Sequence, residues 1–211
     1  VVENCSATIS GGAIWVVYGS SPVFNSCRFD SNTCDLAGGV VYVESGNTAT
    51  FNGCSFEGNS AGTRGGVAYV DDGHVVFTGC TFRGNEAVEN GGAVSYWNGA
   101  TGAVTDCFFT GNYAHGGGGF IFEDCAPAVT GCTFVGNSAA WGGAGYCNSG
   151  ANPAVIASTF HQNSCTNGGM AMSVVASFPV LTRVLFTGQS GAGDLIACVS
   201  GSTVDLDCCD L

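Results

Sequence analysis

The sequence lacks lysine altogether. Its 211 residues carry only four basic side chains, Arg28, Arg64, Arg83 and Arg183, which are scattered along the chain. Against sixteen acidic residues, this gives a formal net charge of −12. Nucleic-acid binding requires clustered basic residues that neutralise phosphates, and an anionic membrane surface attracts basic segments in the same way. Neither nucleic acid nor a membrane is therefore an expected partner.

Long apolar runs and helical patterns are also missing. No segment approaches the ~20 consecutive apolar residues that a membrane-spanning helix needs, and no stretch carries apolar residues at helical spacing. Glycine accounts for 35 residues, which disfavours helix further. The chain begins without methionine and shows no signal-peptide pattern. We therefore expect a processed or partial product.

What the sequence does contain is a repeat. A phenylalanine is followed three positions later by an amide side chain seven times, at intervals of 25 to 27 residues. The phenylalanines are Phe29, Phe56, Phe82, Phe109, Phe134, Phe160 and Phe186, and the amides are Asn32, Asn59, Asn85, Asn112, Asn137, Asn163 and Gln189. Such a period indicates one supersecondary unit stacked on copies of itself, because a single unit cannot bury its apolar face.

Other residue types recur in phase with this phenylalanine. Two residues before it stand Cys27, Cys54, Cys80, Cys107 and Cys132, and then Ser158 and Val184. Seven residues before it stand all four prolines, Pro22, Pro127, Pro153 and Pro179. Proline lacks a backbone donor and is tolerated at the first residue of a strand, so this position predicts strand starts. A Gly-Gly pair such as Gly65-Gly66 follows each of the first six amides, and an apolar run typical of a strand comes next.

These columns predict an all-β fold, a parallel β-helix of seven to eight rungs with about three short strands per rung. We expect one domain over residues 1–211 with partial first and last rungs, because no linker interrupts the period. Each strand would pair with its own copy about 4.8 Å along the axis. Phenylalanine would stack on phenylalanine inside, and the amides would form a structural hydrogen-bonded ladder at a turn.

Thirteen cysteines favour an oxidising, extracellular location. Two interpretations of the cysteine column remain open, disulfides between neighbouring rungs or a column of small buried apolar side chains. Outside the column, Cys125 with Cys147, and Cys198 with Cys208 or Cys209, are candidate cross-rung disulfides. Isolated histidines and the absence of a Cys-x-x-Cys pair argue against zinc, and no metal or cofactor is expected. Asn4-Cys5-Ser6 is a candidate N-glycosylation sequon.

The paired motifs resemble the repeats of chlamydial polymorphic outer membrane proteins and of related algal and protist surface proteins. The resemblance rests on segments such as Phe56-Glu57-Gly58-Asn59 with Gly65-Gly66-Val67-Ala68, and it covers residues 11–190. It implies a right-handed, single-stranded β-helix and a noncatalytic adhesive function at a cell surface.

Three hypotheses for function follow. A polysaccharide lyase or hydrolase would need clustered carboxylates, and the best candidate, Asp71-Asp72-Gly73-His74, is more simply interpreted as a solvated turn. A sugar-binding or lateral contact surface could use a stripe three residues after each Gly-Gly pair. Its members are Trp15, Tyr42, Tyr69, Ser95, Ile121, Tyr146 and Met172. The stripe faces outward only if Ile14, Val41 and Val94 face inward, and the reverse would place it in the core.

The third hypothesis is head-to-tail stacking into a filament or surface appendage. Val1–Cys5 and Val204–Cys208 share an apolar-led pattern that ends in cysteine, which predicts the same phase of the rung for both. An uncapped rung offers free backbone groups to another chain. The favoured function is thus a noncatalytic, extracellular structural or adhesive protein. Polysaccharide binding or cleavage is the alternative.

Overall fold

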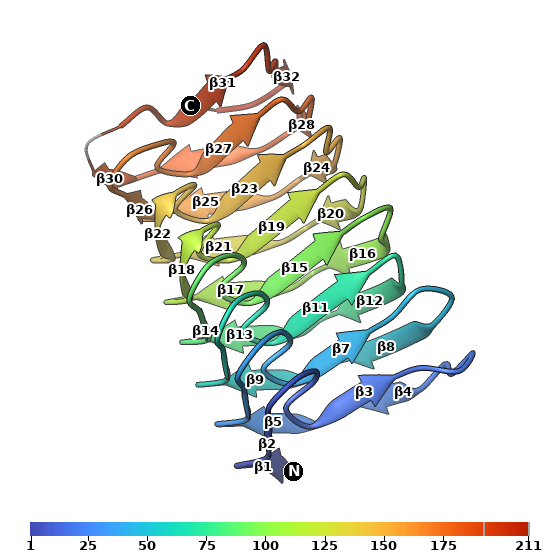
Figure 1. Ribbon diagram of the computed structural model, residues 1–211. Coiled ribbons are helices and arrows are strands. Elements are labelled where there is room, and N and C mark those ends of the chain that lie inside the picture. Colours follow the sequence, from blue (N-terminus) through green and yellow to red (C-terminus); the bar gives the residue numbers. More distant parts are fainter. Residues whose placement is uncertain (192, 211) are drawn as a thin grey trace.

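The computed structural model describes residues 1–191 and 193–210, and these form a parallel β-helix of about eight turns (Figure 1). The described residues contain strands, turns and bends but no helix, and so no helix that could cross a membrane. The strands assemble into four eight-stranded sheets, and every ladder pairs neighbouring rungs in parallel. The prediction of a parallel β-helix is confirmed.

Sheet A contains the repeated phenylalanine. Its strands are β1 (Val2–Glu3), β5 (Arg28–Asp30), β9 (Ser55–Glu57), β13 (Thr81–Arg83), β17 (Phe108–Thr110), β21 (Thr133–Val135), β25 (Thr159–His161) and β29 (Leu185–Thr187). Sheet B follows the amide. Its strands are β2 (Ser6–Ala7), β6 (Thr33–Cys34), β10 (Ser60–Ala61), β14 (Glu86–Ala87), β18 (Tyr113–Gly116), β22 (Ser138–Trp141), β26 (Ser164–Cys165) and β30 (Ser190–Gly191).

Sheet C follows the Gly-Gly pair. Its strands are β3 (Ile14–Val16), β7 (Val41–Val43), β11 (Ala68–Asp71), β15 (Val94–Trp97), β19 (Phe120–Glu123), β23 (Gly145–Asn148), β27 (Met172–Val175) and β31 (Ile196–Val199). Sheet D precedes the cysteine column. Its strands are β4 (Val23–Asn25), β8 (Thr48–Asn52), β12 (His74–Thr78), β16 (Thr101–Thr105), β20 (Ala128–Thr130), β24 (Ala154–Ile156), β28 (Val180–Thr182) and β32 (Asp205–Asp207).

A full rung therefore has four strands, and the expectation of three was wrong. The additional strand is that of sheet B, which is only two residues long in most rungs. Two residues are too few to show an alternating pattern in the sequence. The proline prediction is confirmed, because each proline directly precedes a strand of sheet D, β4, β20, β24 or β28.

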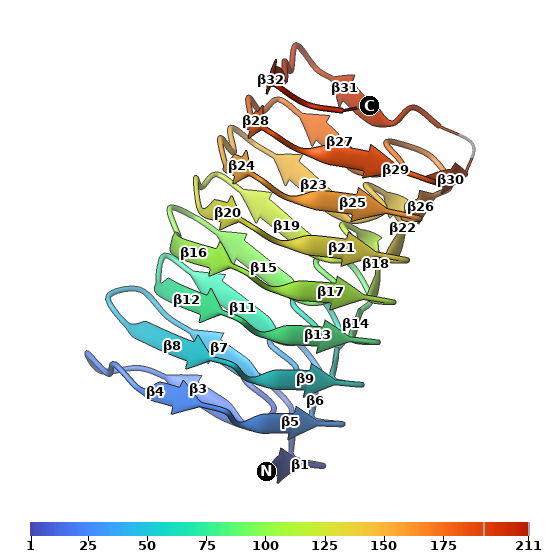
Figure 2. The ribbon, with the colours of Figure 1, turned by 180° about the vertical axis from the view of Figure 1, so that it is seen from behind.

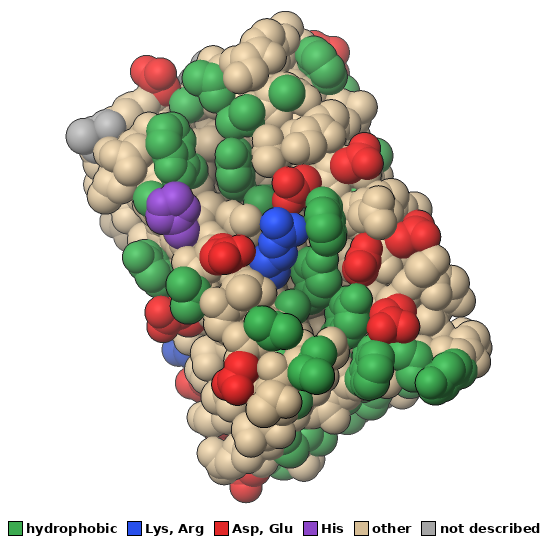
Figure 3. All heavy atoms as spheres, viewed as in Figure 1, with side chains coloured by type: hydrophobic (Ala, Val, Ile, Leu, Met, Phe, Trp, Pro, Cys, Tyr) green, Lys and Arg blue, Asp and Glu red, His purple; other side chains and the backbone are tan. Residues whose placement is uncertain are grey.

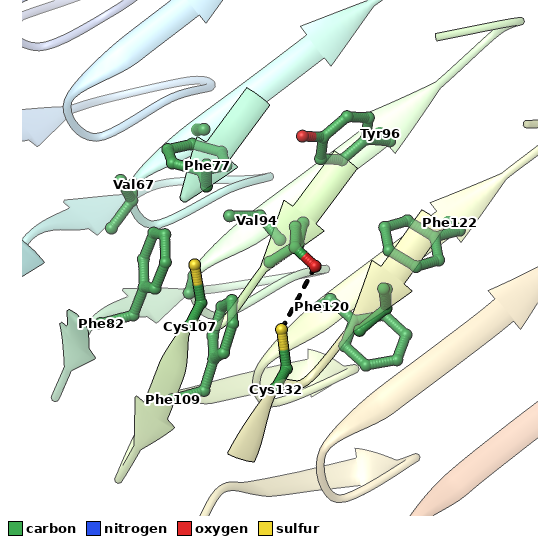
Figure 4. Packing of buried hydrophobic residues seen from close by; sticks show 14 of the residues in the cluster. Val67, Phe77, Phe82, Val94, Tyr96, Cys107, Phe109, Phe120, Phe122 and Cys132 are labelled. Atoms are coloured by element: carbon green, nitrogen blue, oxygen red, sulfur yellow. Dashed lines mark hydrogen bonds between the residues drawn. The ribbon is translucent and has the colours of Figure 1, made fainter. Parts of the chain in front are cut away.

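The interior is filled by stacked identical side chains. Phe109 has no exposed surface, and its ring stacks on Phe82 at 4.3 Å and on Phe134 at 4.7 Å between centroids. Phenylalanines of sheet D meet those of sheet A edge to face, as Phe77 meets Phe82 at 5.1 Å (Figure 4). Aromatic pairs favour both arrangements. Sheets A and D run on from one another across a bend, where Gly53 has φ +58° (Figure 2).

The amides form a ladder along the bend between sheets A and B. The side-chain oxygen of each asparagine after the first accepts two hydrogen bonds from the asparagine of the preceding rung. One comes from the backbone N–H and one from Nδ2, at 2.8 to 3.0 Å. Gln189 continues the ladder with one bond, from the backbone N–H of Asn163. The ladder thus satisfies backbone donors that the bend takes away from sheet pairing.

Asn137 shows the full set of bonds that a ladder member makes in the middle of the solenoid. Its oxygen accepts from the backbone N–H and the Nδ2 of Asn112 at 3.0 and 2.8 Å. Its own Nδ2 donates to Asn163 and to the carbonyl of Phe109, both at 3.0 Å. Asn137 is fully buried, so no water competes for these bonds. The amide positions Asn32, Asn59, Asn85, Asn112, Asn137, Asn163 and Gln189 all occur in this one column.

The cysteine column performs the same task at the bend between sheets D and A. The backbone N–H of Cys80 donates to the sulfur of Cys107 at 3.3 Å, and the Cys132 thiol donates to the carbonyl of Val104 at 3.3 Å (Figure 4). Ser158 takes the place of a cysteine in this column and makes an equivalent hydrogen bond, because its hydroxyl accepts from the backbone N–H of Cys132 at 3.1 Å. The column therefore consists largely of buried thiols that also act as weak hydrogen-bonding groups.

All thirteen cysteines carry free thiols in this structure, and none of the candidate disulfides is formed. The Cys125 thiol donates instead to the carbonyl of Tyr96 at 3.4 Å. Cys198 lies in β31 of sheet C, whereas Cys208 directly follows β32 of sheet D. The second candidate pair therefore belongs to two different walls of the solenoid.

The two chain-end segments lie at different phases of the rung, and the prediction of a common phase was wrong. Val2 pairs with Phe29 in sheet A, whereas Leu206 pairs with Leu181 in sheet D. Val1–Cys5 begins in sheet A and leads into sheet B, whereas Val204–Cys208 contains β32 of sheet D. The similar residue patterns of the two segments therefore do not mark the same place in the rung.

Candidate binding face

The outer surface of sheet C carries the aromatic stripe predicted from the sequence. Trp15, Tyr42 and Tyr69 are in register across neighbouring strands, and Ile14 and Val41 point inward. A second outward row two residues further along has Asp71, Trp97 and Glu123 in register, with Glu44 directly after β7 on the same row. We call these two rows, together with Arg64 and Tyr146, the aromatic–carboxylate face. In Figure 3, hydrophobic and acidic side chains surround a basic one on this side.

Four members of the predicted stripe, Tyr69, Ser95, Ile121 and Met172, are not available to a ligand. Tyr69 points outward but is only 7% exposed, because Arg64 and Trp97 lie beside it. Met172 is fully buried and lies in the inward row, in register with Gly145. In this rung the Gly-Gly pair is displaced by one residue, since Gly169 takes the place that Gly142 holds in the preceding rung. Ser173, not Met172, therefore continues the row of Tyr146.

The middle of the stripe is covered by the chain segments that lead into sheet C. Ser95 and Ile121 are buried although they point outward. Gly91 packs close to the side chain of Ile121, and Gly116 lies close to the ring of Tyr146. A Cβ on Gly116 would come within 2.9 Å of that ring, so the glycine permits the close approach. The exposed part of the face consequently lies over the first rungs and along the second row.

The aromatic rings stack on one another along the axis. Tyr42 and Tyr69 stack at 5.3 Å between centroids, Trp97 lies 6.3 Å from Tyr69, and the guanidinium carbon of Arg64 lies 4.6 Å from the centre of the Trp97 ring. Each of these rings therefore packs beside another ring or beside the Arg64 guanidinium. Trp15 differs, because it is 55% exposed and stacks on no other ring of the described residues. Trp15 therefore offers an open ring face.

The carboxylates accept hydrogen bonds from neighbouring rungs. The indole Nε1 of Trp15 donates to Glu44 at 3.2 Å, and the hydroxyl of Tyr42 makes a long hydrogen bond to Asp71 at 3.5 Å. Asp71 also accepts from the side-chain amide of Asn98 at 3.3 Å. A carboxylate offers about four lone-pair sites. Both carboxylates therefore keep acceptor capacity for hydroxyl groups of a ligand.

Arg64 joins rungs that are not adjacent. It lies in the segment before β11, and its Nη1 reaches Glu123 of β19 at 3.4 Å. Glu123 also accepts from Asn148 at 3.2 Å. No other lysine or arginine belongs to the face, because the chain has no lysine and the remaining arginines lie on sheet A or at its edge. The face therefore has an excess of negative charge and holds its one cation in an ion pair.

The tyrosine hydroxyls of the face remain protonated at neutral pH. Burial, followed by the negative charges of Asp71 and Glu44, raises the pKa of Tyr42 to about 12. Burial and Asp71 also raise the pKa of Tyr69, and burial and Glu123 raise the pKa of Tyr146. These groups can donate hydrogen bonds, but they are poor bases and poor nucleophiles at neutral pH.

The candidate enzymatic segment Asp71-Asp72-Gly73-His74 does not form one site. Asp71 lies on the outer face of sheet C, whereas His74 begins β12 of sheet D. Asp72 accepts a hydrogen bond from Ser45 at 2.6 Å, and His74 Nδ1 lies 2.9 Å from the hydroxyl of Thr101. Both are contacts between neighbouring rungs, the first at a turn and the second between the first residues of β12 and β16. Within residues 1–191 and 193–210, no three His, Cys, Asp or Glu side chains form a group that could hold a metal ion.

The amide and cysteine columns lie apart from this face, inside the solenoid. Asn137 and Cys132 illustrate the two columns, since both are buried and hydrogen-bonded to the preceding rung. A ligand on the outer surface could not reach either side chain without opening the rung. The ladder amides are therefore structural groups of the fold.

Asn4 of the candidate glycosylation sequon is exposed and adopts a left-handed backbone conformation, φ +55°. It occupies the bend between β1 and β2, and its backbone N–H donates to the backbone carbonyl of Asp30 at 3.0 Å. Cys5 follows it in the amide column, where its N–H donates to the side-chain oxygen of Asn32. The Asn4 side chain is therefore accessible in the folded protein.

The family of the chain follows from its sequence as well as from this architecture. The family model described as "Right handed beta helix region" matches residues 1–82 and 61–211, which together cover the chain. No curated protein and no solved structure matches the chain. The solenoid of four parallel sheets and the family match agree, and the chain belongs to the right-handed β-helix family.

Proposed function

We propose that this β-helix is a noncatalytic extracellular adhesive protein and that its aromatic–carboxylate face binds neutral, hydroxyl-rich glycan chains. The observation that carries the proposal is the row of Glu44 and Asp71 on neighbouring rungs, each with acceptor capacity to spare. A straight row with about 4.8 Å between rungs suits an extended polymer that runs along the axis. Trp15 adds one open ring for stacking on a sugar.

The charge of the face supports neutral glycans over acidic ones. A polyuronate would meet Glu44, Asp71 and Glu123, and the only nearby cation, Arg64, is already paired with Glu123. Like charges across an interface are strongly unfavourable. The resemblance of the Phe-x-x-Asn and Gly-Gly motifs to the chlamydial surface repeats supports the adhesive and extracellular parts of the proposal. Cleavage of the bound glycan is the alternative function.

Binding to immobilised neutral polysaccharides and to a polyuronate tests the proposal. We expect the wild-type chain to bind one or more neutral polysaccharides and not to bind the polyuronate. The double variant Glu44→Gln, Asp71→Asn should lose at least about ten-fold in affinity, because two charge-assisted hydrogen bonds weaken. Glu57→Gln, Glu86→Gln is the matched control on sheets A and B. Equal affinity of the two double variants would contradict the proposed face, and release of reducing sugar would contradict the noncatalytic part.

A further inference from the structure

A second surface, on the opposite side of the molecule, is formed by the outer positions of sheets D and A. Figure 2 shows the two sheets following one another as one broad surface. We call its central part, four rows of five side chains from β12 to β29, the threonine face. The rows are Val76, Ala103, Ala128, Ala154, Val180; Thr78, Thr105, Thr130, Ile156, Thr182; Thr81, Phe108, Thr133, Thr159, Leu185; and Arg83, Thr110, Val135, His161, Thr187.

The composition of this face departs from that of the chain. None of its twenty side chains is acidic, although the chain has sixteen acidic residues and a net charge of −12. Arg83 is its one permanent charge, and Asp106 and Arg183 lie at the bend between the two sheets. Nine of the twenty side chains are threonine, and the others are mostly aliphatic. Exposed Asp106 is the one acidic side chain within the outline of the face, so two copies that approach through it would keep most of their negative charge outside the contact.

The hydroxyls of the face are largely free. Among its nine threonines, the described structure gives a side-chain hydrogen bond only to Thr187, whose hydroxyl lies 2.8 Å from Nδ1 of His161. Each remaining threonine presents a methyl group and an unpaired hydroxyl on a rigid, parallel sheet. Methyl groups can be buried against a partner, and hydroxyls can pair with one another, since each both donates and accepts.

We propose that the threonine face is the contact surface of a two-fold symmetric dimer of this chain. Flat sheets of small side chains pack face to face about 10 Å apart, with their strand directions nearly aligned. Five strands spaced by about 4.8 Å and eight residues at about 3.3 Å each give about 600 Å² in plan. A standard interface buries about 800 Å² on each partner. The face therefore reaches the lower end of the range for specific interfaces, about 600 Å² on each partner.

The test is the molar mass in solution, measured by light scattering and sedimentation over a range of concentrations. We expect a dimer for the wild type and half that mass for Thr130→Glu and for Thr130→Lys, each of which sets like charges near the two-fold axis. A one-to-one mixture of the two variants should restore the dimer, since the charges are then opposite. Thr33→Glu on sheet B is the matched control and should remain dimeric.

Thr105→Glu and Thr105→Lys form a second pair one rung away, and unchanged circular dichroism shows that each variant is folded. A monomeric wild type at every concentration would overturn the proposal, as would a dimer that tolerates charge at Thr130 and Thr105. A monomer that instead sediments with ice or an insoluble polysaccharide, and loses that binding in the Thr130 variants, would assign the face to another occupant and equally overturn it.

Discussion

The side-chain oxygen of Asn85 accepts two hydrogen bonds from Asn59, one from its backbone N–H at 3.0 Å and one from its Nδ2 at 2.9 Å. Both residues are fully buried. A single amide therefore satisfies two buried donors of the preceding rung, while its own Nδ2 donates to the carbonyl of Phe56 and to Asn112. The ladder joins neighbouring rungs on the inside of the solenoid as the sheets join them along its walls.

Replacing Asn85 by alanine should destabilise the protein by about 2 to 4 kcal/mol, because each buried donor left unpaired costs about 1 to 3 kcal/mol. Denaturant unfolding followed by circular dichroism measures this loss. Asn137→Ala should cost a similar amount, since Asn137 makes the same four bonds. Gln189→Ala is the matched control at the end of the ladder, because it leaves one donor unpaired, the backbone N–H of Asn163, although the bonds from its own Nε2 to the carbonyls of Phe160 and Thr187 are lost as well. Equal losses for all three variants would contradict the ladder as a source of stability.

The cysteine column makes a prediction that separates hydrogen bonding from packing. Cys107→Val keeps an apolar side chain of similar size but leaves the N–H of Cys80 without its acceptor, so we expect a loss of about 1 to 3 kcal/mol in unfolding free energy. Cys107→Ser should cost less, because Ser158 already fills this column with the same bonds. If valine is tolerated better than serine, the thiols act only as apolar fillers.

Buried thiols should lose their protons only at high pH, and their deprotonation should destabilise the folded protein. Burial raises the pKa of Cys54 from 9.0 to about 11 and that of Cys125 to about 12. Because the folded state favours the protonated thiols, their contribution to stability is complete below pH 9. It is lost as the pH rises through 11 and 12. We therefore expect alkylation at pH 8 to label exposed Cys198 and Cys208 first, as measured by mass spectrometry. Early labelling of Cys54 would show that its rung opens readily.

Arg64→Ala should destabilise the aromatic–carboxylate face modestly. The variant loses the contact over the Trp97 ring at 4.6 Å and the ion pair with Glu123, which together are expected to contribute about 1 kcal/mol to stability because both groups are partly solvated. Thermal unfolding measures the change, and tryptophan fluorescence should shift as Trp97 gains solvent. Arg83→Ala, on sheet A, is the matched control. Identical behaviour of the two variants would show that Arg64 contributes nothing specific.

Several features were accessible to sequence analysis because they repeat. The period predicted the phenylalanines in the core, the asparagines at a bend and the prolines before strands, and all three occupy those places in the structure. The strands of sheet B were not found, since two residues carry no periodic signal. The displaced Gly-Gly pair before β27 also escaped, and it moved Met172 from the expected outer row to the interior.

The repeat in the sequence determines the β-helix fold of this protein, because each rung buries its apolar face only against a rung of the same pattern. Which surfaces stay open was decided at the level of tertiary packing. Tyr69 points outward and yet is covered, Trp15 is open, and the threonines of sheets D and A lie on one outer face. Coverage depends on how the segments between sheets B and C pass over neighbouring rungs. That path is set by contacts between residues roughly one repeat apart, which no local pattern encodes.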